Sequence, residues 1–137
     1  MTKHIAEAEI LSAIPVPPIM TRQAKLERWA DLISERVEGI ALLHNLEHWD
    51  EWKLNMSLGD IYKKNTAFQI AADDPVFKEM GLIDTAISAM NFFDVSQHEL
   101  HEFSCDCGGS ISNNAMARRI RNIADPTWSG WFKNLFR

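Results

Sequence analysis

Two histidines and two cysteines lie close together in the second half of the sequence. They are His98, His101, Cys105 and Cys107. Imidazole nitrogen and thiolate sulfur are the ligand types that zinc prefers in proteins. An exposed thiolate near cationic histidines is also reactive in redox chemistry. These four residues are therefore the candidate metal ligands of the chain, with zinc or iron as the metal and thiol redox chemistry as an alternative.

The spacing of the four residues departs from that of common structural zinc sites. On a helix, His98, His101 and Cys105 would project from one side at i, i+3 and i+7, while Cys107 would point toward the core. Structural zinc sites usually take two ligand pairs from separated segments. A solvated or partner-facing polar surface is the simpler interpretation, so we expect no cofactor and keep zinc as the alternative.

A second cluster, His44, Glu47 and His48, reads H-x-x-E-H. This pattern resembles the signature of the inverted zinc metalloproteases. The resemblance implies that the two histidines bind one ion and that Glu47 acts as a general base. The match covers five residues, and no further carboxylate ligand is identified, so we expect a helix surface that carries two histidines. The sequence leaves open whether this cluster meets His98 or His101 in space.

Composition and charge limit the classes of protein to consider. The chain has 137 residues, of which 46% are hydrophobic, which is enough for one core. Its net charge of −5 disfavours binding to a phosphate backbone. The apolar runs, such as 40–43, are shorter than a membrane span, and no leader pattern opens the chain. Because Cys105 and Cys107 are too close to staple distant segments, we expect reduced thiols in a cytoplasmic protein.

Hydrophobic periodicity predicts an all-α fold, a compact multi-helix bundle with a helix–loop–helix in its C-terminal half. The predicted organisation is an N-terminal arm with a proline-rich linker at 1–20, a helical domain at 21–126 and an aromatic amphipathic tail at 127–137. The best-supported helix begins after a Thr21 cap, and Gly39 leaves open whether one helix or two extend to Lys53.

Further helices are predicted after the one that Thr21 caps, because residues typical of helix N-termini recur along the sequence. Asp74-Pro75 is typical of a helix N-terminus, and Ser96 with Glu99 forms a capping-box pattern for a helix that lasts until about Ser104. The final helix spans about 113 to 124, and Met116, Ile120 and Ile123 are its inward residues. No strand pattern of useful length alternates along the sequence.

Residues 89–103 resemble a helix-turn-helix DNA-binding unit. Its apolar positions hold Ala89, Phe93, Val95, Leu100 and Phe103. The resemblance implies a recognition helix, but Met90 and Asp94 replace a small residue and a turn glycine, and Glu99 and Glu102 would face phosphates. A DNA-binding regulator is therefore our third hypothesis, and nucleic acid is not the partner that we expect.

The loop 104–115 resembles a calcium-binding EF-hand loop. Asp106 stands at a ligand position and Gly109 at the sharp turn, whereas Ser104 and Ala115 replace the opening aspartate and the closing bidentate glutamate. Without these oxygen ligands no calcium binding is expected. The resemblance implies a helix–loop–helix shape.

The tail 127–137 carries one continuous apolar stripe. Its members are Trp128, Trp131, Phe132, Leu135 and Phe136, at i, i+3, i+4, i+7 and i+8. With Lys133 and Arg137 beside it, the stripe would cover the protein's own core, bind a protein partner or dimer mate, or lie on a membrane surface. We take these five residues as candidate partner-binding residues.

The preferred functional hypothesis is a small, non-catalytic helical protein that acts through protein–protein interaction as a regulator or adaptor. It rests on what the sequence lacks, since no phosphate-cradling glycine loop or activated nucleophile is identified. A metal-binding protein or metalloenzyme that uses the His/Cys cluster is the alternative.

Overall fold

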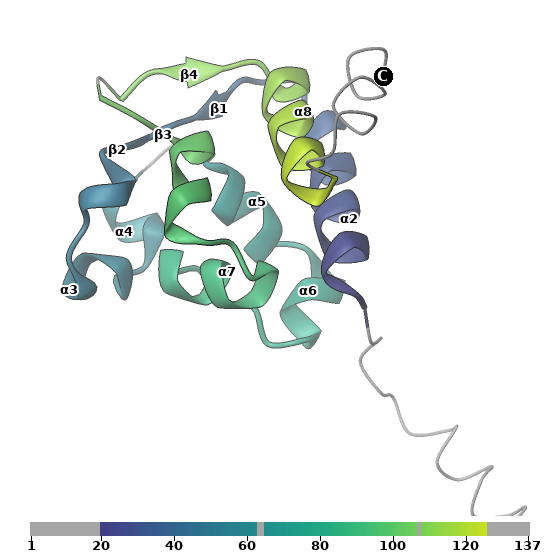
Figure 1. Ribbon diagram of the computed structural model, residues 1–137, viewed down its shortest axis with the longest axis horizontal. Coiled ribbons are helices and arrows are strands. Elements are labelled where there is room, and N and C mark those ends of the chain that lie inside the picture. Colours follow the sequence, from purple (N-terminus) through teal and green to yellow (C-terminus); the bar gives the residue numbers. More distant parts are fainter. Residues whose placement is uncertain (1–19, 63–64, 107, 126–137) are drawn as a thin grey trace, which may run out of the picture.

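The computed structural model describes residues 20–62, 65–106 and 108–125, coloured by sequence in Figure 1. The predicted arm, except Met20, and the whole predicted tail 127–137 lie outside the described residues. In chain order the described elements are α2 (Arg22–Ser34), β1 (Ile40–Ala41), β2 (Leu43–His44), the 3₁₀ helix η1 (Leu46–His48), α3 (Glu51–Leu54), α4 (Leu58–Ile61), α5 (Ala67–Ala72), α6 (Pro75–Glu79), α7 (Ala86–Phe93), the 3₁₀ helix η2 (Gln97–Phe103), β3 (Ser104–Cys105), β4 (Ser110–Ile111) and α8 (Asn113–Ala124).

The helices α2 and α8 lie side by side and run in opposite directions (Figure 1). The side-chain amide of Asn113, at the start of α8, donates to the backbone oxygen of Ser34 at the end of α2, at 3.0 Å. Near the other end of α8, Arg121 Nη2 donates to Asp31 Oδ1 at 2.7 Å. The C-terminal end of α8 therefore lies beside the N-terminal half of α2.

Two small sheets overturn the predicted all-α class, and the fold is mixed α/β although mostly helical. Strand β1 pairs antiparallel with β4, and β2 pairs parallel with β3. The apolar run 40–43 gave no strand signal because each strand has only two residues, which is too short for an alternating pattern. The helix α2 ends at Ser34 and does not continue toward Lys53, because residues 40–41 and 43–44 form β1 and β2.

Gly39 lies directly before β1 and not within a helix. A Cβ atom at this position would lie 3.1 Å from the backbone oxygen of Ile111, which is tighter than ordinary contact. The small residue therefore lets β4 approach β1.

The segment that resembles a helix-turn-helix unit has one α-helix and one 3₁₀ helix. Helix α7 ends at Phe93, and Asp94 takes a left-handed conformation with φ of +52°, which asparagine and aspartate tolerate better than most residues. The helix that we expected from Ser96 to about Ser104 is the 3₁₀ helix η2. Its capping box is confirmed, because the side chains of Ser96 and Glu99 each accept the other's backbone N–H.

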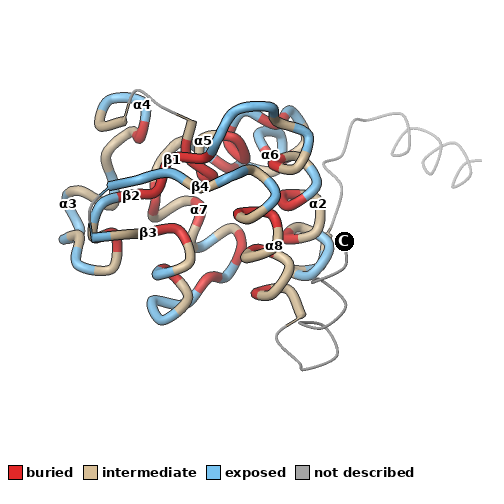
Figure 2. Tube along the Cα trace, turned by 90° about the horizontal axis from the view of Figure 1, so that it is seen from above, coloured by how far each residue is buried: buried red, intermediate tan, exposed pale blue. Residues whose placement is uncertain are grey.

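The core is built around Trp29, which is fully buried on α2. Its ring stacks on Phe93 with centroids 4.1 Å apart and on Phe103 at 5.1 Å, and it lies 5.7 Å from Phe68. The indole N–H donates to the backbone oxygen of Ala67 at 2.8 Å. In Figure 2 the buried segments of several helices turn toward this common interior. Within the described ranges, no helix is long and apolar enough to cross a membrane.

Candidate functional site

The pairing of β2 with β3 joins the two histidine-containing clusters of the sequence. In the register of this pair, His44 is the partner of Cys105, and Leu43 is the partner of Ser104. Side chains alternate between the two faces along each strand, so partners in a parallel ladder project from the same face. The thiol of Cys105 and the imidazole of His44 therefore share one side of this small sheet.

The backbone of His44 is held from both sides by aromatic residues. Its N–H donates to Tyr62 Oη at 2.8 Å, and its carbonyl oxygen accepts from Trp49 Nε1 at 2.8 Å. The two aromatic rings stack on each other, with centroids 6.3 Å apart. On the ring itself, Nε2 lies 3.3 Å from the side-chain amide nitrogen of Asn45. The position of His44 is therefore set by its neighbours, although its side chain is exposed to solvent.

The loop that follows Cys105 turns back toward the sulfur atom. The backbone N–H of Gly109 donates to Cys105 Sγ at 3.0 Å. Gly108 has φ of +70°, a conformation that favours glycine, and a Cβ there would lie 4.0 Å from the Cβ of His44. An N–H donor aimed at sulfur favours the thiolate form. Cys105 is half-buried, whereas Cys107 lies outside the described residues.

The Glu47 carboxylate accepts a hydrogen bond from the buried Ser104. It does not share one helix face with His44 and His48. The Ser104 hydroxyl donates to Glu47 Oε1 at 2.7 Å and accepts the backbone N–H of Leu46 at 3.0 Å. The hydrogen bond from Ser104 is the main reason that the pKa of Glu47 is lowered, and the charges of His48 and His101 add to it.

The expected helix surface at H-x-x-E-H is wrong, because the segment is divided between β2 and η1. Asn45, between these elements, has φ of +52° and breaks any helix there.

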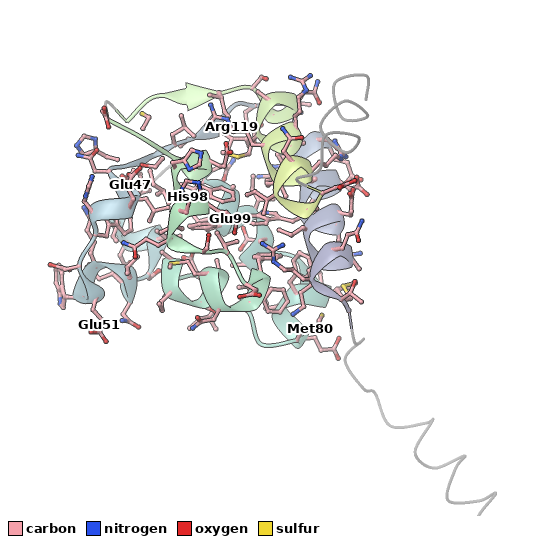
Figure 3. The ribbon with its side chains drawn as sticks, in the orientation of Figure 1. Glu47, Glu51, Met80, His98, Glu99 and Arg119 are labelled. Atoms are coloured by element: carbon pink, nitrogen blue, oxygen red, sulfur yellow. The ribbon has the colours of Figure 1, made fainter. Side chains whose placement is uncertain are left out.

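The histidines of η2 make short-range contacts within that element. His101 Nδ1 lies 2.5 Å from the backbone oxygen of His98, and its Nε2 lies 3.3 Å from Glu102 Oε2. The rings of His98 and His101 are 5.5 Å apart. Figure 3 places His98 on η2 and Glu47 on η1. Among the residues that the structure describes, no group of three or more His, Cys, Asp or Glu side chains is arranged to hold a metal ion.

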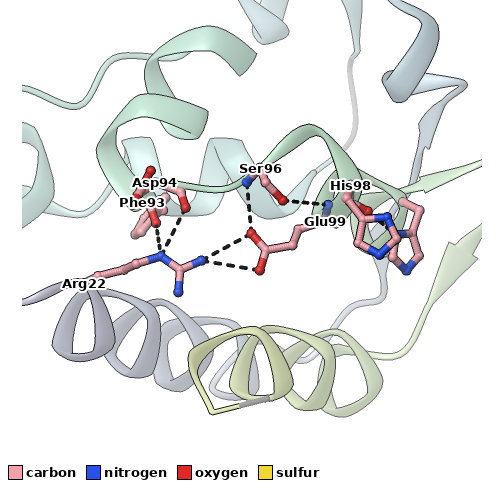
Figure 4. A network of polar contacts seen from close by, with 7 residues as sticks. Arg22, Phe93, Asp94, Ser96, His98 and Glu99 are labelled. Atoms are coloured by element: carbon pink, nitrogen blue, oxygen red, sulfur yellow. Dashed lines mark hydrogen bonds and ion pairs between the residues drawn. The ribbon is translucent and has the colours of Figure 1, made fainter. Parts of the chain in front are cut away.

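A polar network fixes η2 against the rest of the fold (Figure 4). Arg22 Nε donates to the backbone oxygens of Phe93 and Asp94, both at 3.1 Å, and Nη2 donates to Glu99 Oε1 at 3.2 Å. The same Glu99 oxygen accepts the N–H of Ser96 at 2.9 Å. Glu99, which would face phosphates in a helix-turn-helix unit, is part of a structural network that anchors the element preceding Cys105.

Comparison with known proteins adds no relative of this chain: no family model matches it, and neither a curated protein nor a solved structure does. The functional argument therefore rests on the geometry around Cys105. Nothing in the sequence indicated that Tyr62 and Trp49 hold His44 or that Ser104 holds Glu47, because these contacts join separated segments.

Proposed function

We propose that the protein carries out thiol–disulfide exchange with Cys105 as the nucleophile and His44 as its activating neighbour. The observation that carries this proposal is the register of β2 and β3, which makes His44 the partner of Cys105. The thiolate is the reactive form of cysteine, and a protonated imidazole or a backbone N–H beside the sulfur stabilises it. Gly109 supplies the N–H at 3.0 Å.

The exchange requires a substrate that contains a disulfide bond. The thiolate of Cys105 attacks one sulfur, a bond forms between the two sulfurs, and the substrate S–S bond breaks. The other substrate sulfur leaves with the electron pair as a thiolate. Cys107, two residues further along the chain, is the second thiol that would displace the substrate from the mixed disulfide. The substrate disulfide is reduced to two thiols by two electrons from Cys105 and Cys107, which end as a disulfide with each other.

Replacement of His44 by alanine tests the proposal most directly. We expect the rate constant for alkylation of Cys105 by iodoacetamide at pH 7 to fall about tenfold, because the thiolate loses its imidazole neighbour. Both proteins carry Cys107→Ser, so that only one thiol reacts. The matched control is His98→Ala, which removes a histidine of η2 and should change the rate less than about twofold.

A second measurement separates the proposal from metal binding. The variants are assayed for exchange with an aromatic disulfide before and after dialysis against a chelator, together with elemental analysis. An unchanged exchange rate after chelation supports the thiol mechanism. Equal alkylation rates in His44→Ala and its parent would contradict the proposal. Stoichiometric zinc that protects Cys105 from alkylation would contradict it too, in favour of the metal-binding alternative.

Protein binding is a second candidate, and one exposed indole favours it. Trp52 on α3 has 72% of its surface exposed. Its short helix is capped by Asp50 Oδ1, which accepts the N–H of Lys53 at 2.9 Å, and Lys53 Nζ lies 4.6 Å from the ring centre of Trp49. Tryptophan on a fixed element is typical of the residues that dominate the energy of protein interfaces. In this proposal the protein is a regulator or adaptor with a protein partner or a second copy bound at α3.

A photocrosslinking benzoylphenylalanine at position 52 tests the second candidate. We expect a discrete covalent adduct in cells, identified by mass spectrometry, because the side chain would lie inside an interface. The matched control places the same group at position 83, because Ile83 is likewise an exposed apolar residue, with 60% of its surface exposed. Identical adducts from both positions, or none from position 52, would contradict binding through α3. A purified adduct of two identical chains would identify the partner as a second copy.

A further inference from the structure

The outward surface of α2 bears two adjoining hollows. The larger, of about 580 Å³, is lined by Ala24, Glu27, Arg28, Asp31, Leu32 and Glu35. The smaller, of about 330 Å³, lies where the end of α2 meets the α5–α6 junction, and Ile70 and Pro75 add apolar surface there. Both hollows include Leu32 and Glu35, so they adjoin at these two side chains on α2. We call this surface the α2 groove.

The described chain ends close to the beginning of this groove. Arg121 on α8 bonds Asp31 at 2.7 Å and lies 3.8 Å from Glu27 Oε1, and both of these carboxylates line the α2 groove. Asp125 is one turn beyond Arg121, and its N–H donates to the Arg121 oxygen at 3.0 Å. Because α8 runs opposite to α2, residues after Asp125 start beside the N-terminal half of α2.

Length and charge match between the groove and residues 127–137. As a helix, this segment would rise about 15 Å, close to the distance of about 16 Å from Ala24 to Glu35 along α2. Its two cations, Lys133 and Arg137, are four residues apart, and so are the exposed acids Asp31 and Glu35. A segment running along α2 in the same direction therefore places each cation next to an acid.

We propose that residues 127–137 bind in the α2 groove as an amphipathic helix. The aromatic stripe packs against Ala24, Leu32 and the apolar stems of the charged residues. Arg137 pairs with Glu35, and Lys133 adds a second cation to Asp31, which also binds Arg121. The proposal assigns one occupant to the groove, namely this chain's own tail. Its basis is independent of the thiol chemistry at Cys105.

Hydrogen exchange of the full chain, followed by mass spectrometry, tests this docking. The blocking variant is Ala24→Arg, which fills the groove and repels the cationic tail. The matched control is Gln23→Arg, an equal change of charge at an exposed neighbour that does not line the groove. We expect amides in 127–137 to exchange at least about tenfold faster in Ala24→Arg than in the natural protein, and at the natural rate in Gln23→Arg.

A charge reversal adds a second readout that does not depend on filling the groove. Arg137→Glu should speed exchange of the segment, and adding Glu35→Arg should restore part of the protection, because the pair is reversed and not removed. Equal exchange in the natural chain and Ala24→Arg overturns the proposal. So does protection that rises with protein concentration, which indicates a second copy, or protection that requires anionic lipid vesicles, which indicates a membrane surface.

Discussion

Replacing Trp29 by alanine should lower the free energy of unfolding by about 3–5 kcal/mol. The indole is fully buried, and the removed ring leaves a cavity between Phe68, Phe93 and Phe103. The backbone oxygen of Ala67 also loses its donor. Since small domains are stable by only about 5–15 kcal/mol, the variant would retain little of its stability.

Urea unfolding followed by far-ultraviolet circular dichroism measures this effect. The control is Trp52→Ala, because Trp52 is 72% exposed and its removal should change stability by less than about 0.5 kcal/mol. The same substitution should therefore lower the free energy of unfolding strongly at Trp29 and hardly at all at Trp52. A loss below about 1 kcal/mol for Trp29→Ala would mean that the ring is not the centre of the core.

Local signals explain the parts of the fold that the sequence predicted. Two helix starts depend only on contacts within one turn, so they do not require the tertiary structure. They are the capping box of Ser96 and Glu99 and the Asp74-Pro75 start of α6. The inward residues of α8, Met116, Ile120 and Ile123, are all buried as the helical spacing predicted. In each case the deciding contacts lie within a few residues or on one helix face.

The strands and the site depend on contacts between distant segments, and these left no local pattern. His44 and Cys105 are 61 residues apart in the chain, and the strands that pair them have two residues each. The sequence pattern grouped His98 and His101 with Cys105 as candidate metal ligands because they are neighbours in the chain, and this grouping stays a prediction. The strand register adds His44 as the residue paired with Cys105, which no local pattern indicated.

Asp74 joins α2 to α6 through a buried ion pair, and its removal should have the second largest effect. Its two oxygens accept from Arg28 Nε at 2.9 Å and Nη2 at 2.8 Å, and Oδ2 also accepts the N–H of Phe77 at 3.1 Å. Asp74 is only 6% exposed. Breaking a buried pair typically costs about 3–5 kcal/mol. Because the Arg28 side chain is 36% exposed and stays partly hydrated, we expect about 2–3 kcal/mol for Asp74→Asn, below that range.

The dependence of this effect on pH has a definite sign. Hydrogen bonding from Arg28, with the Phe77 N–H and the Arg28 charge adding to it, lowers the pKa of Asp74 in the folded protein. A carboxyl group with a lowered folded pKa contributes stability above its unfolded pKa of about 3.9, and this contribution disappears as the pH falls through the folded pKa. The stability difference between the natural protein and Asp74→Asn should therefore be full at pH 7 and shrink steadily below pH 4.

Urea unfolding between pH 7 and pH 2 checks the size and the sign together. Asp73→Asn is the matched control, since Asp73 is the exposed neighbour of Asp74, and it should stay within about 0.5 kcal/mol of the natural protein at pH 7. A difference for Asp74→Asn that stays constant from pH 7 to pH 2 would mean that the carboxylate charge contributes nothing. The loss would then come from the shape of the side chain and its cap on α6, because only the charged form of Asp74 makes the ion pair with Arg28.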